Sequence, residues 1–321
     1  MLRWALVPAL AFVLAFAGSL VHFAHDDEGR SGEAAAAPGD RLAPADRLVI
    51  TYTPTVDDAD HGYLGSLRLD GSDLENVMEP RGAGEASNVG SPSAAPDGRW
   101  VAFQRASAGS AGAGPPFVYV IPLDGSKPAR RVTRGTAPEI DPAWSPDGRR
   151  IAFARRIHGQ FDLFSARPDG SDAKQVTATP VDELSPAWSP DGERLAFTRY
   201  EDGVERGSGD LWTAHAEGGH ERRLLGDEHD YAGAAWSPDG TRIALLKDSL
   251  VAVMPVRGGA PRPLTPVGDF KESRPAWSRD GKHLAFTRDP GKILTMDADG
   301  AHIRRVPFDR AANGVDWVPG R

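Results

Sequence analysis

The stretch Pro186-Ala187-Trp188-Ser189-Pro190-Asp191-Gly192, followed by Leu195-Ala196-Phe197, decides the fold of this chain. The same order of tryptophan, aspartate–glycine turn and apolar run recurs at 142–153, 235–245 and 275–286, and a weaker copy without tryptophan begins at 95. The turn aspartates are residues 97, 147, 191, 239 and 280, so they lie 50, 44, 48 and 41 residues apart. A repeat of about 40–50 residues is typical of β-propellers and solenoids.

Each repeat contains four short runs that glycine turns separate. In one copy the first run ends at Trp144, and the others are 151–153, 162–165 and 175–177. The Ser-Pro-Asp-Gly segment favours a tight turn, because proline presets its second position and glycine frees its last. Four short strands with such turns predict one antiparallel propeller blade per repeat.

The two ends of the repeat region complete each other. Residues 48–50 resemble a second strand without a first strand before it, and residues 314–319 resemble a first strand at the end of the chain. We therefore predict an all-β fold, a six-bladed β-propeller of four-stranded antiparallel blades over residues 47–321. The C-terminal strand would join the N-terminal blade, and this closure leaves no long unpaired edge.

The N-terminal residues differ from the rest. Residues 4–24 are almost wholly apolar, with Arg3 before them and Asp26 after them, so we assign 1–24 to a signal peptide or an N-terminal membrane anchor. Both alternatives place the rest of the chain outside the cytoplasm, because the positive charge lies before the apolar run. Residues 25–46 lack apolar periodicity and are predicted to be a disordered linker. Membrane contact would then involve only residues 4–24, if they are not cleaved.

Composition excludes several functions. The 321 residues include no cysteine and carry a formal net charge of −8. The lack of cysteine excludes disulfides, thiolate metal sites and a cysteine nucleophile. The acidic balance argues against a nucleic-acid partner, because phosphate binding needs a basic stripe. No nucleophile elbow, phosphate loop or paired-histidine motif occurs in the sequence.

The repeated residues have a structural interpretation. The tryptophans are expected to pack between blades, because a large indole fills such a boundary and its N–H finds a partner there. The aspartates are expected to accept backbone N–H bonds inside their turns. This structural repeat comprises Trp144, Asp147, Trp188, Asp191, Trp236, Asp239, Trp277, Asp280 and Trp317.

Strand order indicates where a binding site lies. The Ser-Pro-Asp-Gly and Asp-Gly turns share one face, here called the turn face, and the longer connections share the other, here called the loop face. Acidic residues recur on the loop face next to the expected tunnel mouth, at Glu139, Asp141, Glu183, Asp230 and Glu272. They could attract a cationic peptide or a free amine, or hold Ca²⁺ through oxygen ligands. The alternative is an ordinary solvated loop paired with Arg274 or Arg134.

The Trp-Ser-Pro-Asp-Gly repeats and the closing Val315-Asp316-Trp317-Val318-Pro319 strand resemble the propeller repeats of the TolB family, also called WD40-like or PD40 repeats. The resemblance covers residues 47–321 and implies an interaction in the cell envelope, with a lipoprotein or a transport complex. TolB proper has an α/β domain before its propeller. Residues 25–46 cannot hold one, so the resemblance does not extend to a full role in the Tol system.

We therefore expect an exported, non-catalytic, monomeric ring that binds a protein, peptide or envelope component on its acidic loop face. The expected location is extracytoplasmic: periplasmic, cell-envelope or secreted. No cofactor is expected, with Ca²⁺ as the one candidate; Asp57, Asp58 and Asp60 resemble a calcium loop only loosely. One alternative is a lyase or lactonase with a metal at the tunnel mouth. Another is a substrate-gating propeller that acts with a separate hydrolase chain.

Overall fold

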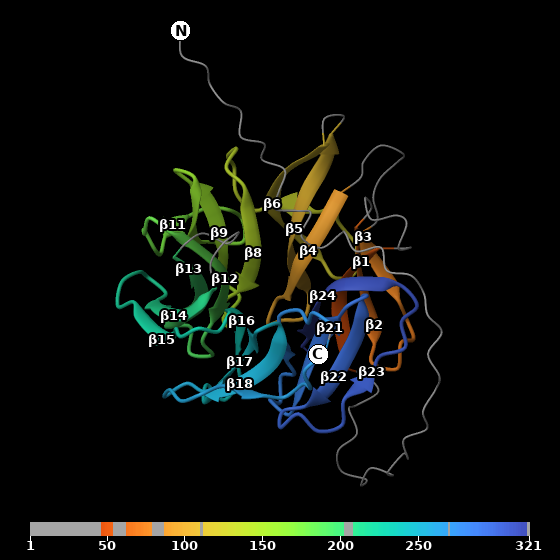
Figure 1. The fold of residues 1–321 in the computed structure, drawn as a ribbon. Helices are drawn as coiled ribbons and strands as arrows, with labels where there is room; N and C mark the ends of the chain where they lie inside the picture. Colours follow the sequence, from red (N-terminus) through yellow and green to blue (C-terminus); the bar gives the residue numbers. More distant parts are fainter. Residues whose placement is uncertain are drawn as a thin grey trace.

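The computed structural model describes residues 46–53, 62–78, 87–109, 112–201, 208–268 and 270–319. Their 24 strands form six four-stranded sheets, which surround a common centre as blades (Figure 1). The predicted signal or anchor, and the predicted linker up to residue 45, lie outside the described residues. Within the described ranges no helix is long and apolar enough to cross a membrane.

The first three blades follow the predicted parse. Blade 1 consists of β24 (Ala311–Val318), β1 (Arg47–Thr53), β2 (Tyr63–Arg68) and β3 (Glu75–Met78). Blade 2 consists of β4 (Ser87–Ala94), β5 (Trp100–Gly109), β6 (Gly112–Pro122) and β7 (Arg130–Arg131). Blade 3 consists of β8 (Glu139–Trp144), β9 (Ile151–Ile157), β10 (Gln160–Ala166) and β11 (Lys174–Gln175).

The other three blades repeat this order. Blade 4 consists of β12 (Asp182–Trp188), β13 (Arg194–Tyr200), β14 (Asp210–His215) and β15 (Arg222–Leu225). Blade 5 consists of β16 (Tyr231–Trp236), β17 (Arg242–Lys247), β18 (Leu250–Pro255) and β19 (Arg262–Pro263). Blade 6 consists of β20 (Ala276–Trp277), β21 (His283–Arg288), β22 (Lys292–Asp297) and β23 (Arg304–Arg305).

Blade 1 closes the ring and confirms the predicted fold class. β24 pairs antiparallel with β1, from Val318 opposite Arg47 to Ala311 opposite Thr53. Its buried side chains join the core cluster that contains Leu48 and Ile50. The sheet order β24-β1-β2-β3 therefore unites the two ends of the propeller in one blade.

The core lies along the second strand of each blade. Neighbouring blades cover both faces of this strand, so its run is apolar over consecutive residues rather than alternating. In all six blades three consecutive residues of this strand are fully buried: 48–50, 101–103, 151–153, 195–197, 243–245 and 284–286. The repeated apolar runs of the sequence are thus the cores of the individual blades.

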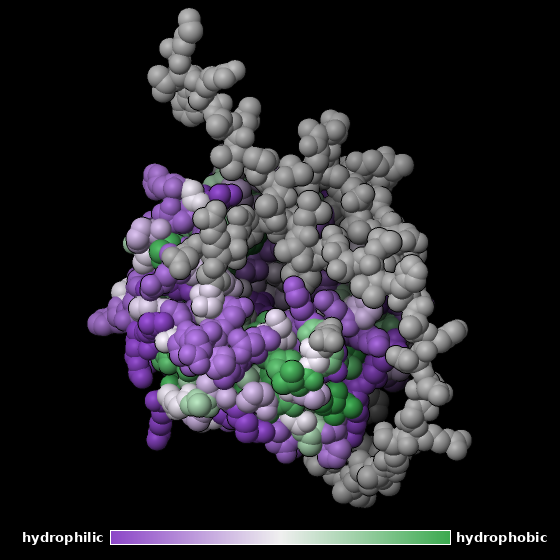
Figure 2. Space-filling model, viewed as in Figure 1, coloured by the Kyte–Doolittle hydropathy of each residue, from purple (hydrophilic) through white to green (hydrophobic). Residues whose placement is uncertain are grey.

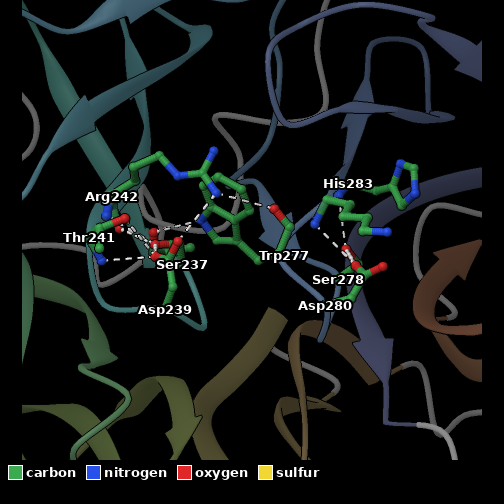
Figure 3. A network of polar contacts seen from close by, with 11 residues as sticks. Ser237, Asp239, Thr241, Arg242, Trp277, Ser278, Asp280 and His283 are labelled. Carbon is green, nitrogen blue, oxygen red and sulfur yellow. Dashed lines mark hydrogen bonds and ion pairs between the residues drawn. The ribbon is translucent and has the colours of Figure 1, made fainter. Parts of the chain in front are cut away.

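The turn aspartates organise the turn face. The carboxylate of Asp239 accepts hydrogen bonds from the Ser237 hydroxyl at 2.6 Å and from the backbone N–H and hydroxyl of Thr241 at 2.9 and 2.8 Å (Figure 3). These bonds, the Ser237 hydroxyl first, lower the pKa of Asp239 to about 2. Gly240 completes the turn with φ of 68°. The serine and backbone bonds recur at Asp147, Asp191 and Asp280.

The repeated tryptophans lie at the blade boundaries. The Nε1 groups of Trp188, Trp277 and Trp317 donate hydrogen bonds to backbone carbonyls of the preceding blade, at 3.1, 3.1 and 2.9 Å. The Nε1 atoms of Trp144 and Trp236 are buried without a hydrogen-bond partner. Indole packing with a cross-boundary bond thus joins three of the six boundaries.

Candidate functional site

Three of the acidic residues expected at the tunnel mouth form buried ion pairs. Glu139, Glu183 and Glu272 are 2, 0 and 5% exposed. Each carboxylate accepts hydrogen bonds from an arginine on the adjacent second strand of its own blade: Arg155, Arg199 and Arg288. The structure therefore places a buried ion pair at each of these positions. The arginines are not Arg274 or Arg134, which the sequence suggests as partners.

Two of these glutamates also connect neighbouring blades. The hydroxyl of Thr133, which follows the last strand of blade 2, donates to Glu139 of blade 3. Thr265, after the last strand of blade 5, donates to Glu272 of blade 6 at 2.6 Å. A threonine–glutamate–arginine clamp thus links each of these blades to the one before it. A role for the three glutamates in binding a partner stays a prediction, and the proposal below rests on other acids.

A regular spacing in the sequence marks these three glutamate–arginine pairs. In each case the arginine lies 16 residues after the glutamate, and the two residues face each other across the strand pair. Blades 2 and 5 keep a cation at the second position but an uncharged residue at the first: Val89 lies opposite Arg105, and Tyr231 lies opposite Lys247. Because the sequence interpretation considered nearby loop arginines, it missed this cross-strand partner.

Asp141 connects three blades along the innermost strands. Its carboxylate accepts hydrogen bonds from the Ser91 hydroxyl of blade 2 at 2.9 Å and from the hydroxyl and N–H of Ser185 of blade 4 at 3.0 and 3.2 Å. Asp141 itself has a positive φ of 54°, at a bulge in β8. Both oxygens are therefore engaged in a bridge between blades.

Asp316 is a further acid on the inner strands, outside the five acidic residues that the sequence predicts as a site. Its carboxylate accepts the backbone N–H of Ala94 in blade 2 at 2.8 Å and the N–H of Trp317 at 2.9 Å. Burial raises the pKa of Asp316 to about 6, against the opposing effects of the Ala94 hydrogen bond and the Arg274 charge. The closing strand thus carries a carboxylate whose ionised form is destabilised.

Replacing Asp316 with asparagine is expected to stabilise the protein above about pH 6 by about 1–3 kcal/mol. Because the pKa is higher in the folded state, only the unfolded chain loses this proton between about pH 4 and 6, and stability falls as pH rises through that window. Urea unfolding at neutral pH and near pH 4 measures the difference, which should disappear at the lower pH. Asp239→Asn is the control with the opposite sign, because the pKa of Asp239 is lowered.

Asp230 lies in a different setting, on the loop face between blades 4 and 5. It is exposed, and one carboxylate oxygen accepts the Gly209 N–H at 2.7 Å. Asp248, in the turn after β17, accepts the N–H of Asp230 at 3.0 Å and bonds a ring nitrogen of His229 at 2.7 Å. Asp227 accepts the His229 N–H, a bond that lowers the pKa of Asp227 and keeps it ionised.

These bonds connect Asp227, Asp230 and Asp248, and two further exposed acids lie on the same face. We call this group the acidic loop patch; its members are Glu201, Asp227, Glu228, Asp230 and Asp248, all exposed. Strand order places all five on the loop face, because they follow β13, β15 or β17. On the face drawn in Figure 2, the coloured surface is mostly hydrophilic, with smaller hydrophobic patches. Asp230 is thus exposed among surface acids, whereas Glu139, Glu183 and Glu272 are buried.

A metal centre finds no support in the described part of the chain. There, no group of three or more histidine, aspartate or glutamate side chains is arranged to hold a metal ion. The weakly calcium-like residues Asp57, Asp58 and Asp60 lie outside the described residues. The three glutamates that were candidate ligands already bind arginine, so they do not fit a Ca²⁺ site.

Comparison with known proteins gives one family. The model of the TolB β-propeller domain matches residues 83–203 and 168–319, well over half of the chain. No protein of curated function matches.

Solved structures with the same fold include TolB from Acinetobacter baumannii, with 21% identity, a TM-score of 0.70 and coverage of 88% of this chain and 69% of that one. A putative TolB from Agrobacterium tumefaciens has 20% identity, a TM-score of 0.62 and coverage of 84% and 91%. A chain of a nidogen/laminin complex has 13% identity, a TM-score of 0.67 and coverage of 85% and 98%. At these identities the structures share the fold alone.

Proposed function

The chain belongs to the TolB β-propeller family, and on this premise we propose that it is an exported ring that binds a basic protein or peptide segment on its acidic loop patch. Family membership supports a non-catalytic propeller that binds proteins. An extracytoplasmic location agrees with the family and with the apolar residues 4–24. A function in the cell envelope and a monomeric ring are further parts of the proposal.

The acidic loop patch is the observation that carries this proposal. Its five carboxylates are exposed, while hydrogen bonds from His229 and backbone N–H groups fix the positions of Asp227, Asp230 and Asp248. A fixed group of like charges attracts an oppositely charged partner and selects against acidic ones. Because hydrogen bonds already hold Asp227, Asp230 and Asp248 in place, these three side chains need little ordering when a partner binds.

The form of the patch favours a segment of a macromolecule over a small ligand. The acids come from three connections in two blades and lie at an exposed surface. A small anion-binding or metal-binding pocket would need convergent groups shielded from water. Lysine or arginine side chains spaced along a partner chain can instead meet separate carboxylates, with an affinity that depends on salt.

Crosslinking in cells tests the proposal directly. A photo-crosslinking residue in place of Glu228 or Glu201 is expected to capture one dominant partner, which mass spectrometry identifies. The control position is Glu193, an exposed glutamate in the turn-face loop of blade 4. Equal capture of the same partner from Glu193 would contradict binding on the loop face.

Neutralising the patch tests the role of charge. The triple variant Glu201→Gln/Glu228→Gln/Asp230→Asn is expected to bind the captured partner at least about tenfold more weakly at low ionic strength, where surface charges act most strongly. Glutamine and asparagine keep the side-chain oxygens, so the bond from Gly209 to residue 230 can persist. Surface plasmon resonance at two salt concentrations measures the effect. Wild-type affinity in the triple variant would overturn the proposal, and Glu193→Gln is the matched control.

A further inference from the structure

A groove opens between blades 2 and 3 on the turn face, opposite the acidic loop patch. Its volume is about 830 Å³, within the range of small-ligand sites, and its floor includes Trp100, Trp144 and Val120. Among its lining residues, Gly148 lies close to Pro96: a Cβ added to Gly148 would lie 3.3 Å from the Pro96 ring. Elsewhere along the groove the Arg130 side chain of blade 2 donates a 2.7 Å hydrogen bond to a carbonyl of blade 3.

At the boundary between blades 5 and 6, an arginine fills the space that corresponds to this groove. There the Arg242 guanidinium lies over the Trp277 ring, 4.7 Å from its centroid, and donates to the Gly281 carbonyl at 3.3 Å (Figure 3). Arg242 lies six residues after the tryptophan of its own blade, and Arg150 and Arg194 hold the same position. In blade 2 this position is Trp100, whose indole faces the groove where blades 3, 4 and 5 carry an arginine.

Most polar groups at the rim already have partners within the protein. Arg150 donates to Ser165 and to Asp172. The carboxylates that line the groove accept N–H bonds from their own turns: Asp97 from Arg99, Asp147 from Arg149 and Asp169 from Ser171. A ligand that is rich in hydroxyl groups, such as a sugar, would therefore meet few free side-chain partners.

The charges at the rim balance. Besides Arg150, which is paired with Asp172, three arginines and three aspartates line the groove: Arg130, Arg149, Arg167, Asp97, Asp147 and Asp169. Equal numbers of opposite charges favour an uncharged ligand over an anion or a cation. The Arg167 guanidinium forms no ion pair within the described ranges, and Arg149 is 86% exposed with only a long, 3.9 Å contact to Asp147, so both can donate to carbonyl oxygens.

We propose that this groove binds an uncharged, proline-rich segment in the polyproline II conformation. Flat pyrrolidine rings fit against indole surfaces, and aromatic-lined grooves are the usual receptors for such segments. Proline has no N–H that would need an acceptor, and the polyproline II backbone leaves its carbonyls free for donors such as Arg149 and Arg167. The site lies on the opposite face from the acidic loop patch and is independent of the function proposed there.

Fluorescence titration of the purified propeller with an acetylated, amidated heptaproline tests this proposal. Saturable binding is expected, while a glycine–serine heptapeptide and maltohexaose give none. Trp100→Arg introduces the arginine that blades 3, 4 and 5 carry at this position, so the variant should fold, and it removes one of the two indoles that line the groove. It is expected to lose at least about tenfold in affinity for heptaproline.

Two further measurements make the test decisive. Melting of Trp100→Arg checks that it folds, and Arg242→Ala, which changes the corresponding position in blade 5, should bind heptaproline as the wild type does. No binding of heptaproline to the wild type, or equal binding by Trp100→Arg, would overturn the proposal. Binding of maltohexaose in place of heptaproline would also overturn it and assign the groove to carbohydrate.

Discussion

Removal of residues Gly314–Arg321 is expected to abolish the folded propeller. This truncation deletes most of β24, whose seven paired residues on β1 close the ring. It also deletes the buried side chains of Val315 and Trp317. Loss of one buried tryptophan side chain costs about 3–5 kcal/mol, and a domain of this kind has only about 5–15 kcal/mol in total. The truncated chain should therefore lack a cooperative transition.

Thermal unfolding followed by circular dichroism measures this outcome. A second truncation that removes only residues 320–321 is the control, and it should melt as the full chain does. The point variant Trp317→Ala gives a graded version, with an expected loss of about 3–5 kcal/mol, because it removes the indole and its bond to the Ala276 carbonyl. Unchanged melting after the larger truncation would contradict closure of the ring by β24.

The fold could be predicted from sequence because its signals are local and repeated. Each Ser-Pro-Asp-Gly turn fixes the first hairpin of a blade through bonds within a few residues, as those of Asp239 show. The apolar run after each turn is buried on both faces, so it appears as consecutive rather than alternating hydrophobic residues. A missing first strand at one end and an extra one at the other predicted the closure that β24 and β1 form.

The site was harder to predict because its chemistry depends on contacts between strands and blades. The sequence places Glu183 close to the loop face, but in the structure its side chain is buried against Arg199 of the neighbouring strand. The groove at Trp100 forms between two blades, so it could not be predicted from one repeat. Trp100 stands where several repeats carry an arginine, and Trp144 of the next blade faces the same space. Asp230 stays on the surface because its carboxylate accepts the backbone N–H of Gly209 and not the guanidinium of a buried arginine.

The buried ion pair between Glu183 and Arg199 in blade 4 should contribute strongly to stability. Glu183→Gln is expected to cost about 3 kcal/mol, because removing one partner leaves the Arg199 charge buried without its main counterion. The side chains of Arg199 and Glu183 are only 8% and 0% exposed, and the arginine also lies 4.0 Å from the centroid of the Trp212 ring. Glu221, the second carboxylate bound to Arg199, keeps the expected cost at the lower end of the range for buried pairs. Chemical denaturation at neutral pH measures this loss.

Two comparisons distinguish the effect of this buried ion pair from that of an exposed one. Glu217→Gln breaks the exposed pair with Lys174 and should cost less than about 1 kcal/mol. The double variant Glu183→Leu/Arg199→Leu should recover most of the loss of Glu183→Gln, because burial also raises the pKa of Glu183 and disfavours its charged form. If Glu183→Gln lowered the free energy of unfolding no more than Glu217→Gln, the buried pair would not stabilise the ring. The glutamate would then be free for the binding role that the sequence predicted.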